Sequence, residues 1–523
     1  MIGRSALMWM LGIAALAALL TYAIVPYASR LASRNGLIDR PGQRKRHAAP
    51  TPASGGVAIF VALLPMFVGL FVLAFLQEMS LSVRDLPKLA SLSCACAWML
   101  LLGVLDDKKS LKWSMKLAGQ AVGVLILAFG GHSVVAATIP YFGTVVFGWA
   151  GILVFGVILI AITNAINLID GLDGLATGIC LFASIAGGVT GYLKGDMLIS
   201  IMQFTLAGAL IGFLPHNWPP ARAFLGDGGS MMLGFFLGTL AISSATVSIP
   251  GQRISMFGAL VAPFLPFFIA FLDIGLTIVR RWMRGRKIYL PDTDHLHHRL
   301  AREFRSVARV NFVVYTFSAV FAGLSVLIAA KPQIAESAWT PILVSFLPIS
   351  LTVLLLRTYR MDPIHHVPRV MAERGHFKFL DLYEQYMGAK LGRAKSVSEC
   401  VALLESGVTD LRLDAVVVCH GDECIERWDN QDPVHVGSTR TTLTRDIEPL
   451  GLSVKAIVPT HERKSYQDSL ELTWVDFLKA LEARLRKMAH GSELQLRLTP
   501  SASDQGVKGH FPLSDGGVAA GRK

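Results

Sequence analysis

The sequence predicts an all-α polytopic membrane protein of about eleven transmembrane helices, followed by a small soluble C-terminal α/β domain. Its 523 residues have a mean hydropathy of +0.50, with 53% hydrophobic and 16% charged residues, which is too apolar for an ordinary soluble protein. Apolar stretches of about 20 residues, enough to cross the hydrocarbon of a bilayer, recur through the first two thirds. After Arg357 charged residues become frequent, and apolar runs shorten to strand length.

Eleven apolar stretches are expected to span the membrane. They cover residues 6–28, 55–76, 89–105, 117–137, 142–163, 176–193, 197–215, 229–249, 255–279, 311–330 and 339–356. The first stretch is too long for the core of a signal peptide and shows no small-residue cleavage site before Pro26, so we expect a permanent anchor.

The basic residues predict the orientation. A formal net charge of +12 would suggest nucleic-acid binding in a soluble protein, but here Lys and Arg gather in alternate loops, at residues 30–46, 108–116 and 280–309. By the positive-inside rule these loops are cytoplasmic and the N-terminus is outside. An odd number of spans then places the C-terminus in the cytoplasm. We expect the bilayer as a partner and no nucleic acid.

The C-terminal part is expected to form its own module. The predicted organisation is a membrane domain at 1–356, a cytoplasmic α/β domain at 357–490 and a disordered tail at 491–523. Strands are expected at Leu413–Cys419 and Leu452–Val458, and helices at Phe377–Leu391, Val397–Glu405 and Leu470–Met488. This module carries no catalytic motif, so packing, regulation and partner binding all stay open as roles.

The six cysteines predict no disulfide framework. Three fall in apolar spans and three in the cytoplasmic tail. Cys419 and Cys424 lack a second pair of ligands, which disfavours a zinc site.

The first chemical motif is Asp106-Asp107, at the inner end of the third span. Adjacent carboxylates at a membrane boundary are costly unless they meet a cation, water or phosphate. On a helix they point about 100° apart, which predicts different roles. The alternative is a solvated helix end balanced by Lys108 and Lys109.

The second motif carries a polar group at every third residue after the fifth span. If this run is helical, its amides and acids form a stripe facing one cavity, and Gly171 and Gly174 leave room for close approach. The stripe consists of Asn164, Asn167, Asp170 and Asp173.

The third motif is Asp227 among glycines, directly before the eighth span, with Asn217 ten residues upstream. A carboxylate at a helix start suits a hard cation, and the helix N–H groups suit phosphate. An ordinary turn with an N-cap is the alternative.

Two further motifs lie in basic loops. The run 291–299 holds His295, His297, His298 and Arg299; it is consistent with diphosphate binding or proton donation, and less so with zinc because no thiolate accompanies it. The run 39–56 holds Lys45 and His47, and could serve topology or lipid contact instead, while its Gly55-Gly56 pair indicates close packing near a site. All five motifs fall in cytoplasmic loops, which favours one shared active site.

These motifs resemble the polyprenyl-phosphate N-acetylhexosamine-1-phosphate transferases, a bacterial branch of glycosyltransferase family 4. The resemblance covers residues 1–356 and rests on DRPGQRKRH, PTPASGG, LDD, NAINLIDGLDGLATG, FLGDGGS and DHLHHRL, in this order. It implies an enzyme of the bacterial cytoplasmic (inner) membrane, with its active site on the cytoplasmic side. The implied reaction moves a sugar phosphate from a UDP-sugar to undecaprenyl phosphate and releases UMP. The implied cofactor is Mg²⁺, with Mn²⁺ as the alternative ion.

The resemblance also implies residue roles. Asp227 and Asp107 would ligate the metal, and Asp106, Asp107, Asp227, His295 and His298 form the implied catalytic set. The implied substrate-binding set is Asn164, Asn167, Asp170, Asp173, Asn217, His297, Arg299, Lys45 and His47.

The HLHHR form resembles the branch that uses simple UDP-N-acetylhexosamines, which makes UDP-N-acetylglucosamine the leading donor. The product would start a cell-surface polysaccharide such as O-antigen or capsule. Three alternatives are kept: a UDP-MurNAc-pentapeptide phosphotransferase, an ion-coupled transporter, which would need acids deep in its spans, and a signalling receptor. Direct and two-step transfer are both open, and so is a homodimer.

Overall fold

The computed structural model describes most of the chain in segments. These are residues 4–39, 50–76, 85–139, 143–246, 262–283, 296–331, 350, 367–411, 413, 415–420, 423–429, 440–447, 452–459 and 464–489. The chain divides into two compact units, Met1–Arg374 and Gly375–Lys523, which are described in turn.

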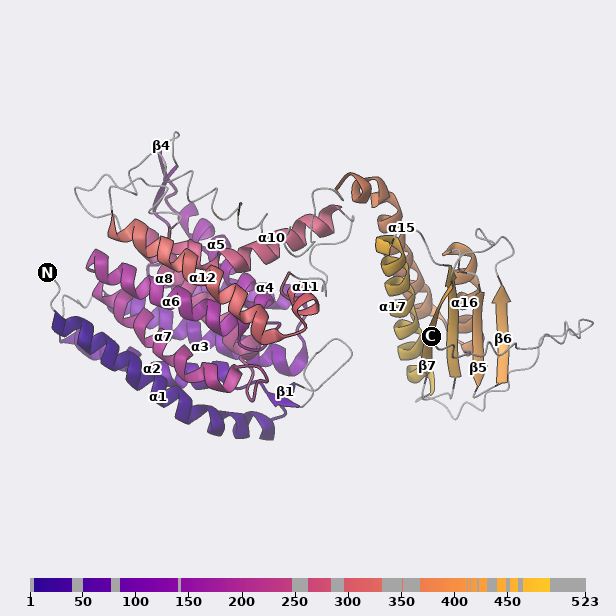
Figure 1. The fold of residues 1–523 in the computed structure, drawn as a ribbon, viewed down its shortest axis with the longest axis horizontal. Helices are drawn as coiled ribbons and strands as arrows, with labels where there is room; N and C mark the ends of the chain where they lie inside the picture. Colours follow the sequence, from indigo (N-terminus) through magenta and orange to yellow (C-terminus); the bar gives the residue numbers. More distant parts are fainter. Residues whose placement is uncertain are drawn as a thin grey trace, which may run out of the picture. The chain divides into compact units, whose positions relative to one another are not determined.

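The first unit is a bundle of helices (Figure 1). They are α1 (Arg4–Arg34), α2 (Gly55–Phe75), α3 (Leu86–Lys109), α4 (Trp113–Phe129), α5 (Ala150–Ile169), α6 (Leu175–Lys194), α7 (Met197–Asn217), α8 (Gly226–Thr246), the 3₁₀ helix η2 (Ala262–Phe267), α10 (Phe268–Met283), α11 (Leu296–Phe304) and α12 (Val307–Ala330). A short pairing of β1 (Ile38–Asp39) with β2 (Thr51–Pro52) closes one end.

The helices make this a multi-pass membrane protein. Within the described segments, nine helices are long and apolar enough to cross a bilayer, counting η2 with α10, and α4 is a shorter apolar helix. The expected span at 339–356 lies outside the described residues except for Ser350.

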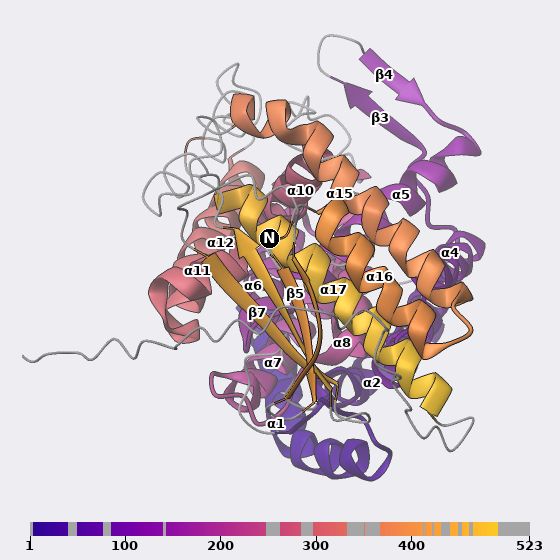
Figure 2. The same ribbon diagram turned by 90° about the vertical axis from the view of Figure 1, so that its right-hand side faces the viewer.

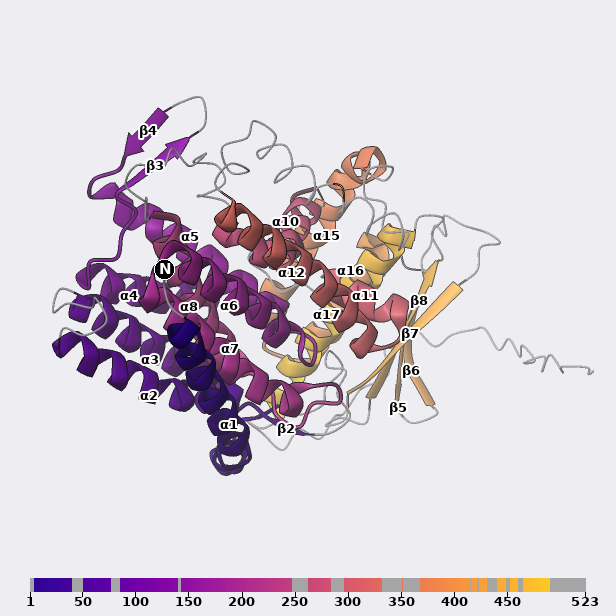
Figure 3. The same ribbon diagram turned by 60° about the vertical axis from the view of Figure 1, so that its left-hand side comes forward.

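Two expected spans differ from the structure at the ends that face each other along the chain. The stretches 117–137 and 142–163 were expected to be continuous spans, but α4 ends at Phe129 and α5 begins at Ala150. Between them β3 (Ala136–Ile139) and β4 (Gly143–Val146) form an antiparallel hairpin. The segment is apolar but rich in β-branched residues, which favour strands, and an average of hydropathy does not separate the two structures. Figures 1 and 3 place this hairpin and the β1–β2 pairing at opposite ends of the bundle.

Glycines let α8 pass through the centre of the bundle. A Cβ at Gly56 of α2 would lie 2.4 Å from the backbone nitrogen of Gly229, and one at Gly103 of α3 would lie 2.4 Å from the backbone of Asp227. The backbones of α2 and α3 therefore touch the first turn of α8 directly, as small residues permit in membrane helices. The packing role expected for the Gly55-Gly56 pair is confirmed at Gly56.

The second unit packs three helices on one sheet. Strands β5 (Ala415–His420), β6 (Glu423–Asp429), β7 (Arg440–Ile447) and β8 (Leu452–Pro459) form an antiparallel sheet in the order β6-β5-β8-β7. The helices are α15 (Val367–Arg393), which belongs to this unit from Gly375 onward, α16 (Val397–Asp410) and α17 (Lys464–Ala489). They run alongside one another (Figure 2). The core joins these helices to alternate residues of β5 and β8, and Trp474 is fully buried.

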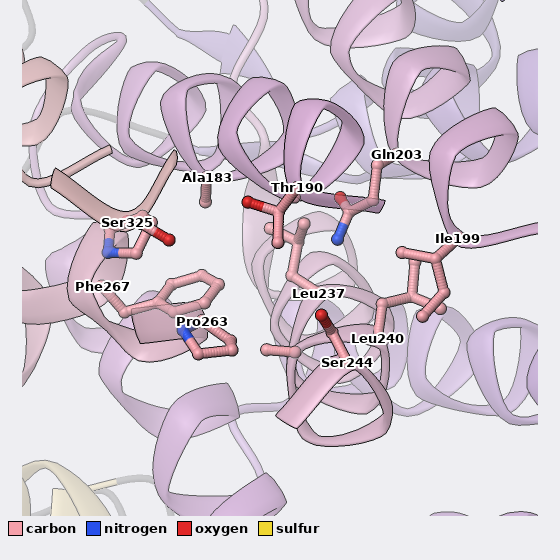
Figure 4. A pocket seen from close by; sticks show the side chains of 13 residues that line it. Ala183, Thr190, Ile199, Gln203, Leu237, Leu240, Ser244, Pro263, Phe267 and Ser325 are labelled. Carbon is pink, nitrogen blue, oxygen red and sulfur yellow. The ribbon is translucent and has the colours of Figure 1, made fainter. Parts of the chain in front are cut away.

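A polar cavity lies inside the bundle between α6, α7, α8, η2 and α12 (Figure 4). Thr190 and Gln203 are buried, and Thr190 Oγ1 and Gln203 Oε1 find no hydrogen-bond partner among the described residues. Ser244 and Ser325 complete the polar lining, and none of the described residues that line the cavity is charged. The charged side chains described below gather at another place in the bundle.

Candidate active site

Three carboxylates meet where the end of α3 faces the start of α8. Asp107 accepts hydrogen bonds from the backbone N–H groups of Asp227 (3.0 Å) and Gly228 (3.3 Å), so it caps α8 from a neighbouring helix. Asp106 is buried and accepts a bond from the backbone N–H of Leu111 at 2.7 Å. The carboxyl groups of Asp106 and Asp227 lie within hydrogen-bonding distance of each other. The two adjacent carboxylates therefore make different contacts, and the different roles expected of them stay a prediction.

The turn into α8 requires a glycine. Gly226 has a φ of +76°, which L side chains rarely adopt, and a Cβ there would lie 2.8 Å from Asp107 Oδ2. Gly226 therefore brings Asp227 and Asp107 together.

Lys116 of α4 is the cation of this cluster. Its Nζ lies 2.5 Å from Asp106 Oδ2 and 3.5 Å from Asp227 Oδ2. The side chain is 22% exposed, so the ion pair is partly shielded from water. The sequence placed Lys116 among the residues that set topology and missed this position, because nothing local distinguishes it from Lys108, Lys109 or Lys112.

The second motif contributes Asn167 and Asp170. Asn167 Nδ2 donates to Asp227 Oδ1 at 2.8 Å and to Ser230 Oγ at 2.9 Å, which ties α5 to α8. Asp170 follows the last residue of α5. Burial raises the pKa of its carboxyl well above the ordinary value, and the nearby charges of Asp227, Asp107 and Asp173 raise it further.

The expected helical stripe is interrupted. Asn164 and Asn167 lie on the last turns of α5, but the helix ends at Ile169 and a turn carries Asp170 and Asp173 before α6 begins. Gly174 has a φ of +78°, which breaks the helix. The four polar residues therefore do not share one face, although Asn167 and Asp170 still reach the carboxylate cluster.

Three predicted substrate-binding residues hold the scaffold. Asn217 Oδ1 accepts from the Gly174 N–H (3.1 Å) and Thr177 Oγ1 (2.7 Å), and its Nδ2 donates to the Ala223 carbonyl (2.9 Å). These bonds use both ends of a buried amide and favour a structural role.

Asn164 and Asp173 make similar structural bonds. Asn164 exchanges hydrogen bonds with Gln120 of α4, at 2.9 and 3.3 Å. Asp173 Oδ2 accepts from the backbone N–H of Ala221 at 2.9 Å. Both contacts hold neighbouring segments around the site.

The histidine motif is anchored by a buried acid. His297 Nδ1 lies 2.7 Å from Asp273 Oδ2, and the Leu296 N–H donates to Asp273 Oδ1 at 2.7 Å. Asp273 falls within the expected span 255–279, and His297 gives this buried acid a partner. The other edge of the ring faces the α5–α6 turn, because a Cβ at Gly171 would lie 2.5 Å from His297 Nε2. The close approach expected at Gly171 is confirmed, and it is made by a histidine.

The remaining predicted residues are placed only in part. Arg299 lies half-buried on α11, and His298 is in the same helix, but its side chain is outside the described residues. Lys45, His47 and His295 also lie outside them.

The cluster has the donor chemistry for a hard divalent cation. Among the described residues, no three acidic, histidine or cysteine side chains already converge as ligands. However, the Lys116 ammonium forms ion pairs with both Asp106 and Asp227, so these two carboxylates already bind one positive charge. Carboxylate and amide oxygens are the ligands that Mg²⁺ prefers, and Asp227, Asp170 and Asn167 supply them here.

The close packing at Gly103 predicts a sensitive position. Gly103→Ala should push α8 away from α3, because the new methyl group would meet the backbone of Asp227 and Gly228, which has no room to give. We expect a lower melting temperature and loss of activity. Gly69→Ala is the control, since a Cβ at Gly69 has no heavy atom within 4 Å. Equal melting temperatures and activities of the two variants would show that the α3–α8 contact does not matter.

Comparison with known proteins decides the family. The family model described as glycosyl transferase family 4 matches residues 89–245, which run from the first turn of α3 to the last turn of α8 and include the carboxylate cluster. Decaprenyl-phosphate N-acetylglucosaminephosphotransferase of Mycobacterium tuberculosis is 35% identical over 326 residues, covering 58% of this chain and 79% of the relative. The chain belongs to glycosyl transferase family 4. It is therefore a transferase.

Two further members of glycosyl transferase family 4 are similar to this chain. The probable undecaprenyl-phosphate N-acetylglucosaminyl 1-phosphate transferase of Bacillus subtilis is 28% identical, covering 64% of this chain and 88% of the relative. Undecaprenyl-phosphate alpha-N-acetylglucosaminyl 1-phosphate transferase of Escherichia coli K12 is 28% identical, covering 58% and 79%. The resemblance drawn from the motifs is confirmed, and the transporter and receptor alternatives are set aside.

Proposed function

We propose that this protein transfers N-acetylglucosamine-1-phosphate from UDP-N-acetylglucosamine to undecaprenyl phosphate, with Mg²⁺, at the cytoplasmic face of the bacterial inner membrane. The observation that carries this proposal is the cluster of Asp106, Asp227 and Lys116, which α3, α4 and α8 bring to one end of the bundle. The three relatives named above are N-acetylglucosamine phosphate transferases that act on polyprenyl phosphates, which supports the same substrates for this chain.

The proposed reaction is a phosphoryl transfer. An oxygen of the lipid phosphate attacks the β-phosphorus of the UDP-sugar, the bond from that phosphorus to the bridging oxygen breaks, and UMP leaves. The product is a lipid diphosphate that carries the sugar. Such reactions need mainly in-line positioning and neutralisation of charge. Bound Mg²⁺, held by Asp227 with Asn167 and Asp170, would supply charge neutralisation at the diphosphate.

The side chains of the cluster take separate tasks. Asp106 beside Lys116 is placed to orient the lipid phosphate or to hold its last proton, while the Lys116 ammonium offsets charge on the transferred phosphate. Asp107 fixes the first turn of α8 and thus the position of Asp227. Asp273 holds His297 through Nδ1 and turns its other edge toward the α5–α6 turn, where it can contact the diphosphate.

A panel of donors tests the substrate. Purified protein, undecaprenyl phosphate and Mg²⁺ are incubated with UDP-N-acetylglucosamine, UDP-N-acetylgalactosamine or UDP-MurNAc-pentapeptide, and UMP and lipid product are measured. We expect the N-acetylglucosamine donor to react fastest and the pentapeptide donor not to react. UMP release from the pentapeptide donor alone would overturn the proposed specificity, and omission of Mg²⁺ should stop the reaction.

A further inference from the structure

The first helix of the second unit exposes an apolar stripe. Three large apolar side chains of α15 are about half exposed: Phe379 (47%), Leu382 (55%) and Tyr386 (53%). Among the described residues of this unit, they are the exposed large apolar side chains. Their spacing of three and four residues puts them on one face of the helix. Water contact at such a stripe is costly, which indicates a partner surface.

The stripe is separate from the core of its own unit. Leu380, Tyr383, Met387 and Leu391 of the same helix are buried against α16, α17 and the sheet. By helical periodicity these core residues centre about 120° away from the stripe. α15 therefore has two apolar faces, and only one is used within the unit.

Basic side chains surround the exposed stripe. Lys378 and Lys390 lie to either side of it by helical periodicity, and Arg393 follows one heptad after Tyr386 on the same face. All three are exposed, and Lys390 Nζ stands 4.6 Å from the centre of the Tyr386 ring. Apolar and aromatic residues with flanking Lys and Arg suit a helix that lies in the headgroup region of an anionic bilayer.

The chain keeps α15 close to such a surface. Residues 357–366 separate the last span expected from the sequence from the start of α15 at Val367. With a span at 339–356, as the sequence predicts, a linker of ten residues that extends at most about 35 Å holds the start of the helix near the membrane. Tethering raises the effective concentration of even a small apolar stripe at the bilayer.

We propose that α15 is an interfacial helix, which docks the second unit on the anionic inner leaflet through Phe379, Leu382 and Tyr386. The occupant of the stripe is the lipid surface. Lys378, Lys390 and Arg393 contact the phosphates of the headgroups.

Lipid-borne quenchers test this docking on the full chain. A fluorophore is attached at Leu382→Cys or at Gly388→Cys, after Cys94 and Cys424 are replaced by Ser. Gly388 is exposed on another face of α15, and a Cβ there has no heavy atom within 4 Å. Each protein is placed, one copy per disc, in nanodiscs of phosphatidylglycerol and phosphatidylcholine, with or without brominated acyl chains.

We expect bromolipid to quench the label at position 382 at least about twofold more than the label at 388. The reason is that the proposal places position 382 at the boundary of the acyl chains and position 388 farther from them. Changing Lys378, Lys390 and Arg393 together to Gln should reduce the difference at low salt and leave it insensitive to added salt, because the charges that salt screens are gone. Equal quenching at both positions, or none at 382, would overturn the proposal. Because each disc holds one copy, quenching at 382 also excludes a second copy as the occupant.

Discussion

Asp227→Asn is expected to abolish turnover while the protein stays folded. The substitution removes one charge from the cluster but keeps the shape of the side chain and an oxygen that can accept from Asn167. Loss of the carboxylate removes the central proposed ligand of Mg²⁺. We expect kcat to fall by about 1,000-fold or more, the scale of losing a group that stabilises charge in the transition state.

The control for Asp227 is the same substitution at the opposite end of the bundle. Asp196 caps α7 by accepting from the Ile199 N–H at 3.0 Å, a bond that Asn also makes. Asp196→Asn should keep both the melting temperature and kcat. Wild-type turnover of Asp227→Asn would remove Asp227 from the metal site.

Lys116→Met is expected to have the second largest effect. Methionine fills a similar volume without charge, so the nearby carboxylates of Asp106 and Asp227 lose their counter-charge. The transferred phosphate loses a cation as well. We expect kcat to fall by about 100-fold or more, as for removal of one charge-stabilising donor, and Lys116→Arg to recover part of it.

The matched control is Lys109→Met, at an exposed position in the last turn of α3 near the same end of the bundle. It removes the same charge from the surface, so its kcat should stay within about twofold of wild type, as for most surface changes. If the Lys109 and Lys116 variants lose activity equally, the effect is one of net charge and Lys116 has no specific place in the site.

Much of the membrane bundle could be predicted because every span crosses the same hydrocarbon layer. One criterion of length, hydropathy and flanking charge therefore applies to each of them. The same averaging hid the β3–β4 hairpin, since its residues are as apolar as a span but are too few for one. The second unit was predictable in outline from the periodicity of its apolar residues. Strands β5 and β8 lie within two residues of their expected ranges, and α15, α16 and α17 contain theirs, although α15 begins ten residues earlier than expected.

The sequence motifs were sufficient to predict which segments form the site. They were not sufficient to predict which residue of each motif faces the carboxylate cluster and which one holds the scaffold. Asp106, Asp107, Asn167 and Asp227 come together as their shared loop face suggested. Tertiary contacts alone distinguish them from Asn217, whose amide is fully used in holding the scaffold.

Two groups of the site were not predicted, and only one of them carries a local signal. Lys116 becomes part of it only because α4 packs on α3, and Asp273 only because α11 returns His297 to α10. An acid deep in a span is such a signal in retrospect, because it requires a partner.

The most direct test of the account follows the β-phosphorus of the donor. UDP-N-acetylglucosamine labelled with a phosphorus isotope at the β-position is incubated with purified protein, Mg²⁺ and undecaprenyl phosphate, and the label is located in the products. Transfer of sugar phosphate predicts that the label stays with the lipid-linked sugar and that the nucleotide leaves unlabelled as UMP. Label leaving with the nucleotide as UDP would mean transfer of the sugar alone and would contradict the account.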